Sequence, residues 1–406
     1  MMHVAGGVYL EYCSDPHWEE LYGSGGRAAA AVSSLSNRVV LHTYVSKQHS
    51  GTLDVLAATF GYQVNSTEIS FTPSFTYTHG FSEPVIRPPC IDPQAAPSLR
   101  VEGDNILRFG FLEGDAIVNG DYVVYDPQSG SNPRPFSENG SSASHLAIVA
   151  NQREIVLLTG ETDIRQASYQ ILKGHGAEVV VVKRAAAGAY VVAQSGEAVI
   201  PVFRTEKVWP IGSGDVFSAI FAYYWAERRI DPVEAARKAS LATALYCSSQ
   251  VLPIPENPEN FPGFLPTPMT VEEWSPTASG PSVYLAGPFF TMSARWLIRE
   301  ARAALQDQGM SVFSPFHDVG YGTATDVAPA DLKALEESRA VLAILDGLDA
   351  GTLFEVGYAR ARGIPVIALA ENVSDGDLTM LTGTGCRIVS DLSSAIYHTV
   401  WTALGA

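Results

Sequence analysis

The chain of 406 residues is 46% hydrophobic and 17% charged, which excludes a disordered protein and exceeds the length of one ordinary domain. Its net charge of −17, with no Lys/Arg cluster, argues against a nucleic-acid backbone as partner. No apolar run approaches the about 20 residues that a membrane-spanning helix needs, so we expect small-molecule partners and no membrane.

At the start of the chain, Met1 to Tyr12 lacks the basic segment and the long apolar run of a signal peptide. The cysteines are scattered, with neither a C-x-x-C pair nor a metal-ligand spacing, which is typical of reduced thiols. They are Cys13, Cys90, Cys247 and Cys386. These features predict a cytoplasmic protein.

Residues 1–251 show the pattern of a first α/β domain. A helix of small residues is expected over Arg27 to Leu35, and residues 60–90 indicate antiparallel strands or a loop. Short apolar runs further along are typical of parallel strands that are covered on both faces. These further elements are strands at 155–158 and 179–182, a hairpin over 190–193 and 198–202, and a helix over 231–249.

A Pro-rich stretch, residues 252–282, separates the first domain from the second. Proline lacks the N–H that helices and sheet ladders need, so this density favours an extended, semi-rigid linker. Residues 283–406 then alternate strands and helices with short connections. This alternation predicts a smaller, doubly wound parallel sheet of flavodoxin-like type. The expected strands are 283–286, 311–314, 340–345 and 365–369, and the expected helices are 293–307, 330–338, 352–362 and 393–403.

The first candidate site is the segment Ile211-Gly-Ser-Gly-Asp215, which runs directly into an apolar stretch. Gly212 and Gly214, with Ser213 between them, permit a tight turn whose N–H groups can hold an anion at a helix start. Asp215 is placed to accept the proton of a hydroxyl that attacks phosphorus. A Gly-rich turn with an N-capping Asp explains the same residues without a site.

The order of three segments resembles the ribokinase (PfkB) family of sugar and nucleoside kinases over roughly residues 1–250. The segments are Gly23-Ser-Gly-Gly26, Asn151-Gln-Arg-Glu154 and Gly212-Ser-Gly-Asp215, and Asp126 matches a common strand-end Asp. The resemblance implies ATP with Mg²⁺ as cofactor and Asp215 as the base. It implies that Gly212, Ser213 and Gly214 form the anion hole. Asn151 and Glu154 would support the Mg²⁺ and the phosphates without binding the metal directly. Glu11, Gly25 and Gly26 would form the sugar-binding end.

Several residues depart from the family pattern. Residues 209–211 stand where an Asp-Thr-Thr-like stretch is usual, and the Asn that follows the Gly-Gly pair is missing. Lys183-Arg-Ala185 replaces a Thr-x-Gly segment near the nucleotide site. Two interpretations remain open: a kinase with an unusual acceptor, or a catalytically silent module that senses a nucleotide or sugar.

The second candidate site lies around the strand expected at 340–345. Asp346 and Asp349 follow this strand, and Glu355 lies in the first turns of the next helix. Ligands of open α/β sheets bind beyond the carboxyl ends of the strands. Acidic groups there suit sugar hydroxyls and a positively charged reaction centre, although each residue alone is also explained as a turn former or a solvated helix residue.

With the segment Tyr284-Leu-Ala-Gly-Pro-Phe-Phe290, these acids resemble the nucleoside 2-deoxyribosyltransferase family over residues 283 to about 400. The resemblance implies Glu355 as the nucleophile on the anomeric carbon, and Asp346 and Asp349 as ligands of sugar hydroxyls or of the leaving base. It implies no cofactor. Asp331, expected at the start of helix 330–338, would handle the base and its protons. The base pocket would be lined by Tyr284, Gly287, Pro288 and Phe289.

The sequence thus predicts a bifunctional enzyme of nucleoside or nucleotide metabolism. Its C-terminal domain would cleave or exchange the N-glycosidic bond of a 2′-deoxynucleoside or its 5′-monophosphate, while its N-terminal domain would transfer phosphate from ATP to a sugar or nucleoside hydroxyl. The alternative is a silent kinase-like module that regulates a nucleotide N-glycosidase, which would suit a defence role. A homo-oligomer is implied by the family likeness alone. Transfer versus hydrolysis, the base preference and the kinase acceptor remain open.

Overall fold

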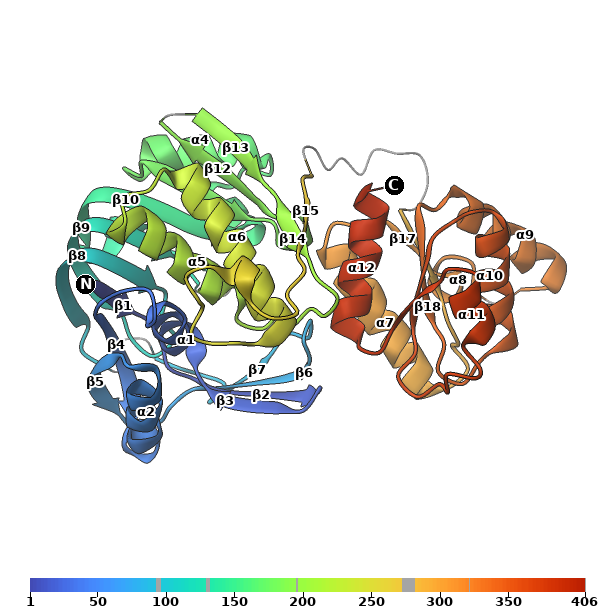
Figure 1. Ribbon diagram of the computed structural model, residues 1–406, viewed down its shortest axis with the longest axis horizontal. Coiled ribbons are helices and arrows are strands. Elements are labelled where there is room, and N and C mark those ends of the chain that lie inside the picture. The colour runs from blue at the N-terminus through green and yellow to red at the C-terminus, as the bar shows by residue number, and fades with distance from the viewer. Residues whose placement is uncertain (93–95, 129–131, 195, 272–281, 321, 406) are drawn as a thin grey trace. The chain divides into compact units, whose positions relative to one another are not determined.

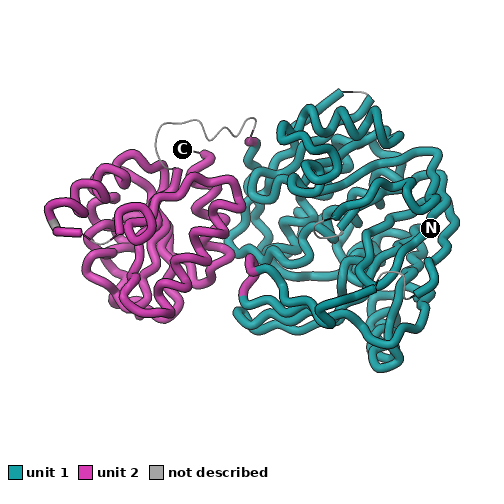
Figure 2. Tube along the Cα trace, turned by 180° about the vertical axis from the view of Figure 1, so that it is seen from behind, with its two compact units in different colours: residues 1–78, 83–270 teal, residues 79–82, 271–406 magenta. Residues whose placement is uncertain are grey.

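The computed structural model describes residues 1–92, 96–128, 132–194, 196–271, 282–320 and 322–405. The chain forms two compact units, coloured separately in Figure 2. Unit 1 comprises Met1–Thr78 and Glu83–Thr270, and unit 2 comprises His79–Ser82 and Val271–Ala406. Each unit has its own central β-sheet and its own hydrophobic core.

Unit 1 is built on a nine-stranded sheet in the order β13-β12-β11-β10-β9-β8-β1-β4-β5 (Figure 1). The strands from β11 to β5 run parallel, whereas β12 and β13 form the antiparallel hairpin that the sequence predicted. The strands are β1 (Met2–Ala5), β4 (Val39–Ser46), β5 (Gln63–Ile69), β8 (Leu99–Phe109), β9 (Ala116–Asp126), β10 (Ser142–Asn151), β11 (Val179–Lys183), β12 (Ala189–Ala193) and β13 (Gly196–Ile200).

Helices cover both faces of this sheet and give three layers, α/β/α (Figure 1). The core on one face includes buried residues of α1, α2, α5 and α6, and the core on the other includes those of α3 and α4. The helices are α1 (Gly23–Val32), α2 (Lys47–Phe60), α3 (Gln152–Thr159), α4 (Ile164–Gly174), α5 (Ser213–Ala222) and α6 (Pro232–Ser249), and the short helical segments are η1 (Phe136–Asn139), η2 (Ala185–Ala187), η3 (Tyr223–Glu227) and η4 (Pro258–Asn260).

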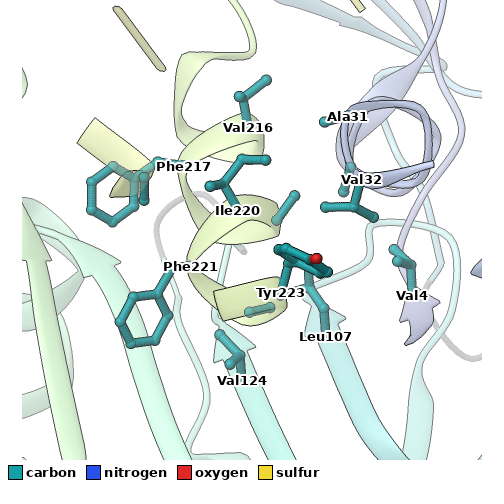
Figure 3. Close-up of a cluster of buried hydrophobic side chains, with 14 of the residues drawn as sticks. Val4, Ala31, Val32, Leu107, Val124, Val216, Phe217, Ile220, Phe221 and Tyr223 are labelled. Carbon is teal, nitrogen blue, oxygen red and sulfur yellow. The ribbon is translucent and has the colours of Figure 1, made fainter. Parts of the chain in front are cut away.

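Helix α5 lies at the centre of the larger core. Figure 3 shows Ile220 of α5 and Tyr223 just after it facing Leu107 of β8 and the α1 residue Val32. All of them are at most 5% exposed. Because cores pack at the density of organic crystals, this contact holds α5, whose first turn carries Asp215, at a fixed position against the sheet.

A second, four-stranded sheet of order β3-β2-β6-β7 carries Glu11 on its β2 strand. Strands β6 and β7 pair antiparallel, which is one of the two alternatives that the sequence left open for residues 60–90. The same stretch also holds all of β5, which pairs parallel with β4. The strands of the second sheet are β2 (Leu10–Asp15), β3 (Trp18–Leu21), β6 (Ser74–His79) and β7 (Val85–Arg87).

Two elements of unit 1 differ from the sequence prediction. The prediction of a strand at 155–158 is wrong, because these residues lie in helix α3. A four-residue apolar run does not distinguish a strand from a buried helix, and Asn151 with Glu154 forms a capping box that starts the helix. Helix α1 begins at Gly23, four residues before the expected Arg27, because packing against the sheet outweighs the low helix propensity of glycine.

The residues predicted as a Pro-rich linker, 252–282, are distributed differently. Residues 252–270 belong to unit 1, and β15 (Thr267–Met269) pairs antiparallel with β14 (Val202–Arg204). In this two-stranded sheet every strand is an edge, the position in which a sheet tolerates a proline such as Pro268. Residues 272–281 lie outside the described residues.

Unit 2 is a five-stranded, all-parallel sheet of order β17-β16-β18-β19-β20. Counted along the chain this order is 2-1-3-4-5, that of the flavodoxin-like doubly wound fold, which confirms the predicted fold class. Helices α7 and α12 cover one face, and α9, α10 and α11 cover the other (Figure 1). The strands are β16 (Val283–Ala286), β17 (Val312–Phe313), β18 (Ala340–Ile344), β19 (Val366–Leu369) and β20 (Arg387–Val389).

The helices of unit 2 are α7 (Met292–Asp307), α8 (Pro315–Asp318), α9 (Ala324–Glu337), α10 (Ala350–Ala361), α11 (Thr379–Gly383) and α12 (Leu392–Gly405). The sequence missed β20, α8 and α11, which are all too short for a periodic pattern. Helix α9 begins six residues before the expected start at 330, with Pro329 inside it. Asp331 therefore lies within the helix and does not open it.

Candidate active sites

The Gly-rich turn of unit 1 leads into α5 as the sequence predicted. Gly212 has a φ of +78° and occupies the N-cap position, so Ser213 is the first helical residue and Asp215 lies in the first turn. A side chain at Gly212 would be strained by this φ and would collide with Arg27, because its Cβ would lie 2.1 Å from the Arg27 Nε atom. The turn therefore needs glycine at this position.

Both carboxylate oxygens of Asp215 accept hydrogen bonds. Gln128 Nε2 donates to Asp215 Oδ1 over 2.7 Å, and Arg27 Nη1 pairs with Asp215 Oδ2 over 2.8 Å. Asp215 is 8% exposed. The alternative interpretation of Asp215 as the N-cap is wrong, because Gly212 takes that position.

Arg27 connects the two predicted ends of this site. Its guanidinium also pairs with both oxygens of Glu11, and its Nε donates to the Tyr246 hydroxyl over 3.1 Å. Arg27 is 0% exposed and Glu11 is 5% exposed. Burial raises the pKa of Glu11, although the charge of Arg27 opposes this rise.

Gly25 and Gly26 lie in the first turn of α1, directly before Arg27. The Gly25 N–H donates to the carbonyl oxygen of Gly7 over 2.9 Å, and both glycines are buried. The predicted sugar-binding residues Glu11, Gly25 and Gly26 thus lie in the same site as Asp215. Arg27 connects them, because it follows Gly26 in α1 and bonds to both Glu11 and Asp215.

A second group of charges lies at the ends of β9 and β11, the strands on either side of β10. Lys183, the last residue of β11, donates to Asp126 Oδ2 over 2.5 Å, and the Ser218 hydroxyl donates to the same oxygen over 2.6 Å. Burial alone would lower the pKa of Lys183, but the charges of Asp126 and Glu154 raise it. A Cβ at Gly214 would lie 3.5 Å from Lys183 Nζ, so this cation is next to the Gly-rich turn.

Asn151 and Glu154 form a capping box at the start of α3. Each side chain accepts the backbone N–H of the other residue over 2.8 Å. Burial, and next the charge of Asp126, raises the pKa of Glu154 to about 7. The box fixes the Glu154 side chain beside Asp126 and Asp215, with both of which it interacts electrostatically.

The acidic groups here fit Mg²⁺, which prefers one or two carboxylates together with substrate phosphates. Among the described residues, Asp126 Oδ1 is buried without a hydrogen-bond partner, so it retains a lone pair for a cation or a bound water. Glu154 is the second carboxylate of this group. No cluster of three or more His, Cys, Asp or Glu suited to a metal occurs in the described part of the chain.

The candidate site of unit 2 centres on Glu355. Tyr284 on β16 donates its hydroxyl to Glu355 Oε1 over 2.7 Å, across the point where the strand order reverses between β16 and β18. This reversal is where ligands bind in flavodoxin-like sheets. Burial raises the pKa of Glu355 to about 7; the Tyr284 hydrogen bond opposes the rise, and the charges of Asp331 and Asp349 add to it.

Asp331 faces the same region from α9. Its burial raises the pKa of Asp331 to about 6, and within the described residues its Oδ1 atom is buried without a hydrogen-bond partner. Its charge acts on both Glu355 and Tyr284. Two carboxyl groups with raised pKa values beside each other are a common mark of a functional site.

The structure places Asp349 and Asp346 differently from each other. Asp349 is the N-cap of α10, accepting from the Thr352 N–H over 2.9 Å, and its charge still reaches Glu355. Asp346 accepts the backbone N–H groups of Glu371 and Asn372 over 3.0 and 2.6 Å. The geometry therefore gives Asp346 a structural task, joining the end of β18 to the loop after β19.

We expect Asp346→Ala to lower stability rather than to remove a catalytic group. Loss of two charge-assisted hydrogen bonds on a half-exposed carboxylate should cost about 1–3 kcal/mol in the free energy of unfolding. Urea denaturation of the purified chain measures this cost. A variant of unchanged stability that loses activity would instead return Asp346 to a substrate-binding role.

The predicted base-pocket residues follow β16. Gly287 is closely packed, because a Cβ there would lie 2.6 Å from Ile298 Cδ1. Phe289 is half-buried, like Pro288, and stacks on Phe316 with ring centroids 5.4 Å apart. Together these residues bring an aromatic surface to the end of the strand that carries Tyr284.

Two family models match the chain. Residues 116–256 match the pfkB family carbohydrate kinase, and residues 283–385 match the nucleoside 2-deoxyribosyltransferase. The chain joins a PfkB-type kinase region to a nucleoside 2-deoxyribosyltransferase-like region. Unit 1 is hereafter the kinase-like unit and unit 2 the transferase-like unit.

A curated relative and several solved structures are similar to the kinase-like unit. The 5-dehydro-2-deoxygluconokinase of Bacillus subtilis is 28% identical over 142 residues, which span 31% of this chain and 43% of that relative. The match thus spans less than half of that relative's length. Ribokinase of Thermotoga maritima is 18% identical, with TM-score 0.47, covering 64% of this chain and 98% of its own. Aminoimidazole riboside kinase of Salmonella enterica, complexed with its riboside and an ATP analogue, is 15% identical, with TM-score 0.48, covering 61% and 94%.

Sequence reasoning missed three residues of the kinase-like site. Arg27, Gln128 and Tyr246 all contact Asp215 or its partners. Arg27 offered a signal, because it is the one charged residue among glycine, serine, alanine and valine from Gly23 to Ser34. Gln128 and Tyr246 offered none. Among the helices that the structure describes, none has the length and hydrophobicity for crossing a bilayer.

Proposed function

We propose that the transferase-like unit cleaves the N-glycosidic bond of a 2′-deoxynucleoside or its 5′-monophosphate through Glu355. One observation carries this proposal: a carboxylate with a raised pKa, held by Tyr284, at the strand-order reversal of a flavodoxin-like sheet. Its match to the nucleoside 2-deoxyribosyltransferase family supports the choice of substrate class.

The proposed chemistry uses two carboxyl groups in different protonation states. Ionised Glu355 attacks the anomeric carbon as the bond to the base nitrogen breaks, and protonated Asp331 gives its proton to that nitrogen. Water or a second base then attacks the anomeric carbon from the opposite side and releases Glu355, so the configuration is retained. Tyr284 holds Glu355 beneath the sugar through its hydrogen bond.

This proposal predicts a bell-shaped pH dependence of kcat/KM. The active pair needs Glu355 ionised and Asp331 protonated, although the pKa of Glu355 is about 7 and that of Asp331 about 6, so it is a minor species whose fraction is greatest between pH 6 and 7. The rate falls below about pH 6, where both carboxyl groups are protonated, and above about pH 7, where both are ionised. Asp331→Asn should remove the alkaline limb. Tyr284→Phe should move the ionisation of Glu355 to higher pH, because the lost hydrogen bond favoured the ionised form. Initial rates of base release between pH 5 and 9 measure both shifts; a flat profile would contradict the assignment.

The experiment that tests the reaction itself is product analysis. The full chain is incubated with deoxynucleosides and their monophosphates, each with and without a second base, and the products are identified by mass spectrometry. Free base alone indicates hydrolysis, and a new nucleoside indicates transfer. If the N-glycosidic bond of every substrate stays intact, the proposal fails.

For the kinase-like unit we propose transfer of a phosphoryl group from ATP-Mg²⁺ to a hydroxyl, with Asp215 as base. The Gly212–Gly214 turn and Lys183 would hold the phosphates, and Asp126 and Glu154 would hold the Mg²⁺ directly or through water. The ion supplies charge neutralisation at the phosphates. The match to the pfkB family over residues 116–256 supports this reaction class.

The second candidate for this unit is nucleotide binding without phosphoryl transfer. The observation in its favour is that Asp215, the proposed base, is already held by Arg27 and Gln128. ATP consumption by the full chain with a panel of sugars and nucleosides separates the two. Consumption that depends on an acceptor supports the kinase, and ATP binding without consumption supports the binding module.

A further inference from the structure

The buried side chain of Arg27 bears on both candidates for the kinase-like unit, because it contacts Asp215, the proposed base. It is the largest side chain under 2% exposed in the described part of the chain. Its guanidinium bonds to Glu11, Asp215 and the Tyr246 hydroxyl. It also lies over the Tyr22 ring, 5.2 Å from the ring centroid, which adds a cation–π contact.

These contacts fill the space where a sugar hydroxyl would be bound. Under the proposed function, Glu11 binds acceptor hydroxyls and Asp215 takes the proton of the attacking one. Both Glu11 oxygens bond to Arg27, and Asp215 divides its oxygens between Arg27 and Gln128. Arg27 also touches the Gly-rich turn, since its Nε atom would lie 2.1 Å from a Cβ at Gly212. The side chain thus spans the distance from the acceptor end to the phosphate end.

We infer that Arg27 is an internal occupant of the acceptor pocket and excludes neutral sugars and polyols from it. This inference rests on the proposed function, which assigns the pocket to Glu11 and Asp215. A neutral hydroxyl cannot displace a guanidinium that is paired with two buried carboxylates, because breaking such a pair leaves an uncompensated buried charge. The pocket is therefore closed to neutral acceptors, while the phosphate end beside Lys183 is not occupied by Arg27.

Arg27 is well placed for this role because it does not depend on a mobile loop. It lies in helix α1 directly after Gly26, and that helix is buried along its whole length. Tyr246 of α6, which accepts from Arg27, in turn donates to the Ile211 carbonyl oxygen over 2.9 Å. The guanidinium is thereby fixed from α1, from α6 and from the segment before the Gly-rich turn.

The test is direct binding of neutral polyols to the full chain without any phosphate donor. Saturation-transfer NMR with ribose, fructose and inositol at millimolar concentration compares wild type with Arg27→Ser. We expect no detectable binding by wild type, and binding by Arg27→Ser at least about tenfold tighter than the weakest affinity that the measurement detects, because the freed carboxylates can accept hydrogen bonds from hydroxyls. Arg38→Ser is the matched control, because Arg38 is exposed and bonds to Gln63.

Binding gained in the pocket should weaken when Glu11→Gln is added to Arg27→Ser, because hydrogen bonds to a charged carboxylate are stronger than those to a neutral amide. Sugar binding by the transferase-like unit would not respond to this substitution. Wild-type binding as tight as that of Arg27→Ser would overturn the inference. So would a folded Arg27→Ser chain that binds no polyol, or whose affinity for polyols is unchanged by Glu11→Gln. If Arg27→Ser does not fold, Arg27→Lys decides. Lysine keeps a positive charge beside the carboxylates but lacks the planar guanidinium that pairs with two oxygens at once. Measurable polyol binding by Arg27→Lys, weaker than expected for Arg27→Ser, supports the inference, and no binding refutes it.

The proposed kinase activity can fail separately from this inference. If Arg27→Ser binds polyols but transfers no phosphate from ATP, Arg27 is the occupant and the kinase assignment is wrong. If wild type phosphorylates a neutral polyol, the kinase assignment holds and the inference about Arg27 is wrong.

Discussion

Replacing Glu355 by glutamine should reduce base release from a deoxynucleoside substrate by at least about 10³-fold, the loss expected when a covalent nucleophile is removed. Glutamine has nearly the size of glutamate and can still accept the hydrogen bond from Tyr284. It cannot attack the anomeric carbon. The measurement is the rate of base release at saturating substrate, followed by chromatography.

The fold should survive this substitution. Burial raises the pKa of Glu355, which means that the folded unit holds an ionised carboxylate there at a cost in free energy above about pH 7. Neutral glutamine removes this cost, so thermal unfolding of Glu355→Gln at pH 8 should occur at or above the wild-type temperature. A lower unfolding temperature would make loss of activity a stability effect.

The matched control is Glu337→Gln, the same substitution on α9, where the side chain is exposed and pairs with Lys333. It should leave the rate unchanged. Residual activity of Glu355→Gln above about a tenth of wild type would exclude Glu355 as nucleophile. An enzyme that has lost its covalent nucleophile does not retain so large a share of its rate.

The transferase-like site could be predicted from sequence because its residues follow strands that the apolar pattern defines. Tyr284 lies within strand β16 and Glu355 in the second turn of helix α10, two elements that the sequence predicted. Asp346 could not be separated from Asp349 in this way. Which of two acids caps a helix and which holds a distant loop depends on the approach of β19, and no local pattern encodes that distance.

In the kinase-like site, only groups of residues that are adjacent in the sequence could be predicted. The Gly-rich turn and Asp215 are one continuous segment, and Asn151 with Glu154 is a capping pattern that reads locally. Arg27 and Asp215 are 188 residues apart, and their ion pair arises only from the packing of α1 against α5. Sequence alone therefore indicated Asp215, the proposed base, but not Arg27, which holds it.

Asp215→Asn should reduce phosphoryl transfer from ATP by about 10² to 10⁴-fold, the usual range for loss of a general base. The substitution is made in the Arg27→Ser chain, in which neutral acceptors are expected to bind. Asparagine keeps the size of the side chain and leaves the Gly212–Gly214 turn unchanged. The affinity for ATP should therefore stay near its starting value while the rate constant falls. Acceptor-dependent ADP formation at varied ATP measures both quantities.

The control for this substitution is Asp163→Asn, which changes an Asp to Asn at the N-cap of α4 in the same unit. Asparagine caps helices about as well as aspartate, so neither stability nor transfer should change. Equal transfer rates with and without Asp215→Asn would show that another group takes the hydroxyl proton. A parallel loss of ATP affinity would instead assign Asp215 to the binding of the Mg²⁺-nucleotide, because the general base acts on the attacking hydroxyl and not on the bound phosphates.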